Sequence, residues 1–280
     1  MTDTGSGTHV ATATVAAPRP EEVEAPSSSS LHTAYLLGLG DDALIYAQRL
    51  GEWLTHAPQI EEDMALGNIG LDLLGQARSL LTHAGQVEGA DPVRDEDDLA
   101  MLRDEREFRN LQLVEQPRGD FGQEMARLLW FASYQHALYS RLVDSTDETL
   151  AAIAAKALKE VDYHRDHAAQ WVLRLGDGTQ ESHRRMQTGL EAVQPYVAEL
   201  GEDHDAARWA AEQGIGVLPS TLVEEVNAYV TSVLEEATLA MPDAPRWHAR
   251  GGREGVHSEV MGYLLAELQH IARSHPGATW

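Results

Sequence analysis

Apolar residues recur at alternating intervals of three and four positions along residues 147–176, which restricts this segment to an amphipathic helix. The inward-facing positions are Leu150, Ala154, Ala157, Val161, His164, Ala168, Trp171 and Leu175. Asp147 can cap the start of this helix, and Gly176 can end it. Because such a helix has to bury its apolar face, the segment predicts packing against further helices.

Three other segments predict long helices. Asp41 and Asp42 can cap one that runs to about Trp53, Pro58 suits the first position of the next, and Gly119-Asp120 begins another. The inward positions of the helix that follows Pro58 are Leu66, Ile69, Leu73, Gln76 and Leu80. Those of the helix that follows Asp120 are Met125, Leu128, Ala132, Leu138 and Leu142. Shorter helices are expected at about 180–200, 203–213, 219–239 and 257–274. No strand-type alternation of useful length is visible.

The connection between the second and third long helices, about 30 residues, is long enough for the crossover that ferritin-like bundles require. We therefore predict an all-α, ferritin-like four-helix bundle with additional C-terminal helices. Residues 1–30 are rich in Thr, Ala, Gly, Pro and Ser and lack apolar periodicity. They are predicted to form a disordered N-terminal tail, and residues 31–280 a single ferritin-like helical domain.

Charge and cysteine content exclude several functions. The formal net charge of -24 opposes binding to nucleic acid and to anionic membrane surfaces. There is no apolar run of the ~20 residues that span a bilayer, and no secretory signal, so we expect a cytoplasmic protein. The chain has no cysteine, so carboxylate and imidazole groups would have to hold any metal.

A carboxylate-bridged di-iron bundle takes one Glu from each of two helices and Glu-x-x-His from each of two others. The corresponding positions here are degenerate: Asp72 with Gly75 in one helix, and Glu160 with Tyr163 in another. Gly75 has no side chain to offer, and His164 is out of phase by about 100° around the helix. The first and third long helices offer only Glu52 and Glu124, both near helix ends. We predict no catalytic, cofactor-binding or metal-ligating residue.

An alternative uses Glu160, His164 and His167, which lie on one helix face, together with Asp72, to hold a single metal. The competing interpretation is a hydrogen-bonded polar pair of Glu160 and His164 inside the bundle.

A loop near the C-terminus contains two further features. The sequence Glu-x-x-His also occurs at Glu254-Gly255-Val256-His257. This segment lies in a glycine-rich loop, so we expect it to initiate a helix, with Ser258 or His257 near the cap. The preceding basic cluster is Arg246, His248, Arg250 and Arg253. We interpret this cluster as a solvated loop. Contact with an anionic ligand such as coenzyme A, or with an acidic partner, is an open alternative.

Several long motifs resemble the C subunits of phenylacetyl-CoA epoxidase complexes, in order from about residue 33 to Trp280. They comprise residues 48–53, 56–58, 68–78, 103–106 with Phe108, 114–117, 159–160, 163–164 and 255–259. Ser258 stands where Thr is expected. The resemblance implies a ferritin-like structural protein that lacks the metal site and supports a catalytic partner, the A subunit. That partner would carry the di-iron centre and epoxidise phenylacetyl-CoA, with electrons from NADPH through a separate reductase.

Three hypotheses for the function therefore remain. The leading hypothesis is this structural role in the epoxidase, without a cofactor of its own. The second is a metal-dependent oxygenase that uses Asp72, Glu160, His164 and His167. The third, a storage or DNA-protecting ferritin relative, is opposed by the negative charge and by the missing ligand set.

Overall fold

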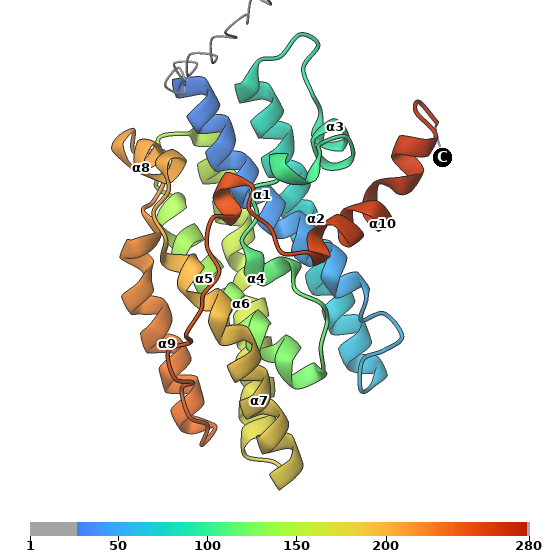
Figure 1. The fold of residues 1–280 in the computed structure, drawn as a ribbon. Helices are drawn as coiled ribbons and strands as arrows, with labels where there is room; N and C mark the ends of the chain where they lie inside the picture. Colours follow the sequence, from blue (N-terminus) through green and yellow to red (C-terminus); the bar gives the residue numbers. More distant parts are fainter. Residues whose placement is uncertain (1–26, 279–280) are drawn as a thin grey trace, which may run out of the picture.

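Four long helices form the body of the protein in the computed structural model, which describes residues 27–278. They are α1 (Ser28–Gly51), α2 (Ile60–Glu88), α5 (Phe121–Leu142) and α6 (Glu148–Gly176). α1 packs against α2 and α5 packs against α6, and the two pairs meet through α2 and α6 (Figure 1). There is no strand within the described part of the chain. The predicted all-α, ferritin-like bundle is confirmed.

The predicted starts of α5 and α6 are correct. The Asp120 side chain accepts a hydrogen bond from the backbone N–H of Gln123, and that of Asp147 accepts from Thr149 and Leu150. The apolar faces predicted for α2 and α5 are buried. On α6 the predicted face is buried as far as Ala168, and its last two members, Trp171 and Leu175, are partly buried.

The start of α1 was predicted wrongly. Its N-cap is Ser27, whose hydroxyl oxygen accepts from the backbone N–H of Ser30 at 3.1 Å. The last serines of the predicted tail therefore belong to the helix, while residues 1–26 lie outside the described residues. Asp41 and Asp42 are buried in the middle of α1 and cap nothing. α2 begins at Ile60 with Gln59 as N-cap, two residues after the position expected from Pro58.

The connection from α2 to α5 is a crossover segment that packs on α1. It contains α3 (Glu96–Met101), η1 (Glu105–Glu107) and α4 (Gln112–Glu115). The crossover was predicted from its length. Its buried arginine, Arg103, gave no apolar signal and was not predicted as part of the interior.

The predicted C-terminal helices are present. They are α7 (Gln180–Val197), η2 (Ala198–Gly201), α8 (Asp205–Glu212), η3 (Pro219–Leu222), α9 (Val223–Glu236), η4 (Gly252–Glu254) and α10 (Val260–Ser274). α7 and α9 lie along α5, and α8 lies against α1. α10 extends from the body toward the C-terminus (Figure 1).

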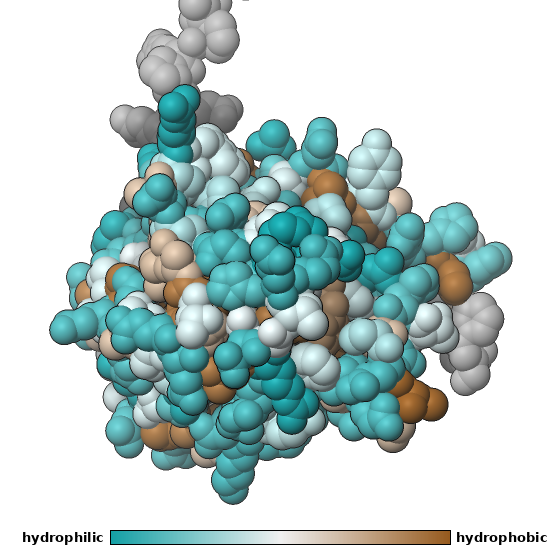
Figure 2. All heavy atoms as spheres, turned by 90° about the horizontal axis from the view of Figure 1, so that it is seen from below, coloured by the Kyte–Doolittle hydropathy of each residue, from teal (hydrophilic) through white to brown (hydrophobic). Residues whose placement is uncertain are grey.

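The outer surface agrees with the acidic composition. On the face seen from below, hydrophilic side chains predominate and apolar ones gather only in small separate groups (Figure 2). Between residues 27 and 278, no helix combines the length and the apolar character needed to span a membrane.

Candidate functional site

The degenerate positions lie where α2 meets α6. His164 Nε2 lies 3.1 Å from Asp72 Oδ2, and the His164 side chain is buried. Burial lowers the pKa of His164 more than the hydrogen bond and charge of Asp72 raise it, so the ring is neutral near pH 7. The neutral imidazole donates from Nε2 to the Asp72 carboxylate, whereas His164 Nδ1 is buried without a hydrogen-bond partner. The partner of His164 is Asp72, and not Glu160 as the sequence suggested.

Glu160 is held by two other side chains. Gln76 Nε2 donates to Glu160 Oε2 at 3.0 Å, and Lys156 Nζ lies 3.4 Å from Glu160 Oε1. The amide oxygen of Gln76 in turn faces Gln135 and Tyr139 at 3.5 and 3.4 Å. Amide and hydroxyl groups therefore satisfy the interior, and the nearest charge to Glu160 is an ammonium.

Lys156 also lies next to Gly75. A Cβ at Gly75 would be 4.0 Å from Lys156 Nζ, which is the only neighbouring atom at that distance. Lys156 is 70% exposed and lies beside the position where Glu-x-x-His bundles carry a ligand, at the edge of a depression of about 250 Å³. Its positive charge opposes the binding of a cation by Glu160.

The four residues of the alternative metal site do not converge. His167 Nε2 lies 3.2 Å from Glu62 Oε2, whereas His164 pairs with Asp72 and Glu160 with Gln76. Tyr163 is 51% exposed, and its ring packs beside that of His167. The lone candidate Glu124 is fully buried and accepts from Tyr46 and Trp53, while Glu52 caps the end of α1 beside Arg49.

A second polar network, which the sequence did not reveal, fixes the crossover and the C-terminal loop to α1. Arg103 binds both carboxylate oxygens of Asp41, and Arg253 binds both of Asp42 at 3.0 and 2.7 Å. Their pairing leaves the carboxylates inside the body with charged partners, which buried carboxylates need.

The same network includes His257 of the Glu-x-x-His sequence at residues 254–257. His257 is buried against Glu115, which also accepts from Asn110 and from the backbone N–H of Ser258. Glu254 is exposed, and α10 begins at Val260 with Glu259 as N-cap, so the segment 254–257 ends two residues before the cap.

Glu199 closes the network. It accepts from the backbone N–H groups of Gln112 and Gly252 at 2.7 and 2.8 Å. Burial raises the pKa of Glu199 to about 7, because its partners are backbone amides and Arg253 only partly offsets the desolvation.

The basic cluster divides into two parts. Arg253 is internal, which corrects its interpretation as a solvated residue, whereas Arg246 and Arg250 are exposed. Arg250 and His248 contact one another and line a depression of about 490 Å³ with Trp247. This depression is the place where the two exposed arginines can meet an anionic group.

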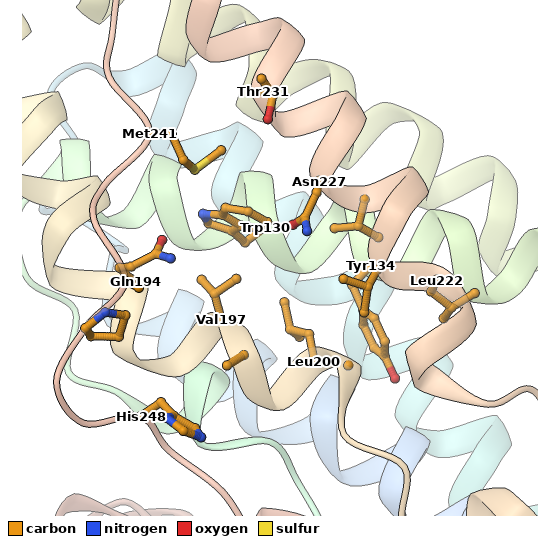
Figure 3. Close-up of a pocket in the computed structure, with 16 residues that line it drawn as sticks. Trp130, Tyr134, Gln194, Val197, Leu200, Leu222, Asn227, Thr231, Met241 and His248 are labelled. Atoms are coloured by element: carbon orange, nitrogen blue, oxygen red, sulfur yellow. The ribbon is translucent and has the colours of Figure 1, made fainter.

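A cavity of about 500 Å³ lies between α5, α7 and α9 (Figure 3). Trp130 and Tyr134 reach it from α5, and Met241 and His248 from the segment before α10. Its lining contains no carboxylate, and no second histidine that could form an acid–base pair with His248. The lining is mainly apolar.

Comparisons with known proteins agree with the resemblance seen in the motifs. A family model described as "Phenylacetic acid catabolic protein" matches residues 15–280, which includes half of the predicted tail. The chain is 46% identical over 248 residues to the C subunit of 1,2-phenylacetyl-CoA epoxidase from Escherichia coli (strain K12). That alignment covers 89% of this chain and 98% of the relative.

Proposed function

The chain belongs to the family of phenylacetic acid catabolic proteins, and from this membership we propose that it is a non-catalytic, structural subunit of a phenylacetyl-CoA epoxidase. In this proposal it docks against the catalytic A subunit, which carries the di-iron centre and epoxidises the aromatic ring. Electrons come through a separate reductase component. This chain supplies no cofactor for the reaction and acts in the cytoplasm, with neither nucleic acid nor membrane as a partner.

The observation that carries the proposal is the state of the degenerate ligand positions. Asp72 is hydrogen-bonded to His164 Nε2, and Glu160 is paired with Gln76 and Lys156. A di-iron site needs several carboxylates that face the same point, and the ammonium of Lys156 opposes such an arrangement. The bundle is thus kept intact around a polar interior that is not organised for metal chemistry.

A second apolar face on α2 supports docking to a partner. We call it the outer stripe: Ile60, Met64, Leu71 and Leu74, which are 71%, 64%, 66% and 39% exposed. Gly67 lies in the same row, between Met64 and Leu71. The five positions are then separated by steps of four, three, four and three, which is the spacing of a helix that packs against another helix. The inner face of α2 is already buried by the bundle. The outer stripe therefore suits a helix of a second ferritin-like protein, because exposed large apolar groups in one row mark interaction surfaces.

Co-expression with the catalytic partner tests the proposal. We expect the two chains to co-elute in size-exclusion chromatography, with iron confined to the partner and epoxidation activity that requires this chain. The proposal fails if no stable complex forms and the catalytic partner is fully active on its own.

A further inference from the structure

Three side chains from three helices meet at the end of the bundle where α1 begins. His32 Nε2 lies 3.0 Å and His83 Nε2 lies 2.6 Å from the same oxygen of Asp147, Oδ2. All three atoms lie within 4.8 Å of one another, and the side chains are largely buried. Within residues 27–278 this is the only set of three histidine, cysteine or carboxylate ligand atoms that converges so closely.

We propose that His32, His83 and Asp147 bind one divalent transition-metal ion, with zinc as the expected occupant. Zinc binds imidazole nitrogen and carboxylate oxygen at about 2.0–2.2 Å, which places tetrahedral ligand atoms about 3.3 Å apart. The two contacts to Asp147 Oδ2 are within about 0.7 Å of this spacing, and the two histidine nitrogens lie within 4.8 Å of each other, so an ion would bind with rotation of the side chains. Two imidazoles and one carboxylate favour zinc or iron over magnesium or calcium, and water completes the coordination.

Two of the ligands, His32 and Asp147, have pKa values shifted in the direction that a metal site needs. Burial lowers the pKa of His32, so its ring is neutral at pH 7 and offers a lone pair. Burial acts to raise the pKa of Asp147, but hydrogen bonds from His83 and from the Leu150 backbone N–H lower it below the ordinary value. Asp147 is therefore ionised, and the site has one negative charge to attract a cation.

Asp147 is oriented by its role at the start of α6. Its Oδ1 accepts the backbone N–H groups of Thr149 and Leu150, each at 3.0 Å, which leaves Oδ2 to face the two histidines. Hydrogen bonds that hold a ligating carboxylate in this way are typical of metal sites. The indole ring of Trp209 lies 5.6 Å from the His32 ring and covers one side of the cluster.

An ion has a path to the site and lies far from the degenerate positions. His83 lines a surface depression of about 440 Å³ together with Gln86 and Thr149, which connects the cluster with solvent. Asp147 precedes His164 by seventeen positions along α6, roughly 25 Å at 1.5 Å per residue. The ion would clamp α1, α2 and α6, and its binding energy would add to folding stability. The prediction of a metal-free chain rested on the degenerate positions alone and did not consider this cluster.

The test uses the full chain without an affinity tag, stripped with a chelator and titrated with Zn²⁺ by calorimetry. We expect one equivalent per chain and a rise in melting temperature. Co²⁺ should give the visible absorption of a tetrahedral site. Asp147→Asn keeps a good helix cap but removes the charge, and His83→Asn removes one ligand. Each should weaken Zn²⁺ binding by at least the ~10–100-fold that loss of an outer-shell partner costs.

Two matched variants serve as controls. Asp120→Asn makes the same change at the cap of α5, and His164→Asn removes a histidine from the other histidine–aspartate pair; both should keep one equivalent of Zn²⁺. Without an ion, the same three residues would form a hydrogen-bonded set in which both imidazoles donate to Asp147. Binding of no Zn²⁺ by the wild type, unchanged binding in His83→Asn, or loss in His164→Asn would each overturn the proposal.

Discussion

His257 donates a hydrogen bond from Nδ1 to Glu115, whose carboxylate oxygen lies 2.8 Å away in the interior. Its other ring nitrogen, Nε2, lies 3.1 Å from the carbonyl oxygen of Phe108. A carboxylate and a carbonyl are both acceptors, so the two contacts favour the imidazolium form of His257 and hold its pKa above the ordinary 6.5. A buried charge pair therefore joins the C-terminal loop to the crossover segment.

This pair predicts stability that falls as pH rises. Burial lowers the pKa of His257, but the hydrogen bond and charge of Glu115 and the carbonyl of Phe108 outweigh it and hold the pKa above the ordinary 6.5. A group with a raised pKa contributes fully below the unfolded value, and its contribution is lost as pH rises through the folded value. We expect the free energy of unfolding, measured with urea, to fall as pH rises above the ordinary value of 6.5.

His257→Gln isolates this contribution, because Gln keeps a donor for Glu115 but does not titrate. At pH 6 the variant should be about 3 kcal/mol less stable than the wild type, as when one partner of a buried pair is lost. The difference should shrink as pH rises through the pKa of His257 in the folded protein. Glu199 has a pKa of about 7 and makes the free energy of unfolding depend on pH in both proteins. This contribution is the same in each and cancels in the difference. A difference that stays constant with pH would show that His257 is neutral in the folded protein.

Arg253 predicts a large effect for a conservative change. Its guanidinium binds both oxygens of Asp42 and also the carbonyls of Gly38 and Arg109. Arg253→Lys keeps the charge but loses the planar fork, and should lower the free energy of unfolding by about 2 kcal/mol. Arg246→Lys, an exposed change in the same predicted cluster, should stay within about 0.5 kcal/mol. Equal effects in urea denaturation would mean that Arg253 is solvated after all.

Local patterns predicted the parts of the fold that depend on neighbouring residues. The caps at Asp120 and Asp147 and the apolar face of α6 follow from residues within one or two turns of each other. Asp41 and Asp42 were misread because a carboxylate after glycine is typical of a helix start. Their partners, Arg103 and Arg253, are 62 and 211 positions away. No periodicity reports such pairs, since they depend on tertiary packing.

The candidate site shows the same limit. The sequence predicted that Gly75 and Tyr163 break the ligand pattern, a prediction that needs only the spacing along one helix. It paired Glu160 with His164, which share a helix face, whereas the structure pairs each with a residue of α2. The sequence did not predict the cluster of His32, His83 and Asp147 for a similar reason. These residues lie on three separate elements and form no motif.

The pairing of Asp72 with His164 can be measured by a double-mutant cycle. Alanine at both positions should give a coupling energy of about 1 kcal/mol in urea denaturation at pH 7, because the residues share a hydrogen bond. The Asp72 and Glu160 cycle should give almost none. The same variants, assembled with the catalytic partner, should keep wild-type turnover per complex. Strong coupling between Asp72 and Glu160, or turnover lost from an intact complex, would instead indicate a shared metal.

Leu71 lies at the middle of the outer stripe and is 66% exposed, so a change there can affect assembly without affecting the fold. Leu71→Glu would place a charge in an interface from which water is excluded, at a cost of at least about 2 kcal/mol, or a ~30-fold loss of affinity for the catalytic partner. Val93→Glu, at a site of similar exposure outside the stripe, should bind normally. Both variants should melt like the wild type when measured without the partner, and affinity can be measured by interferometry with the catalytic partner immobilised. If Leu71→Glu binds as tightly as Val93→Glu, the partner uses a different face, and the outer stripe is an ordinary exposed row.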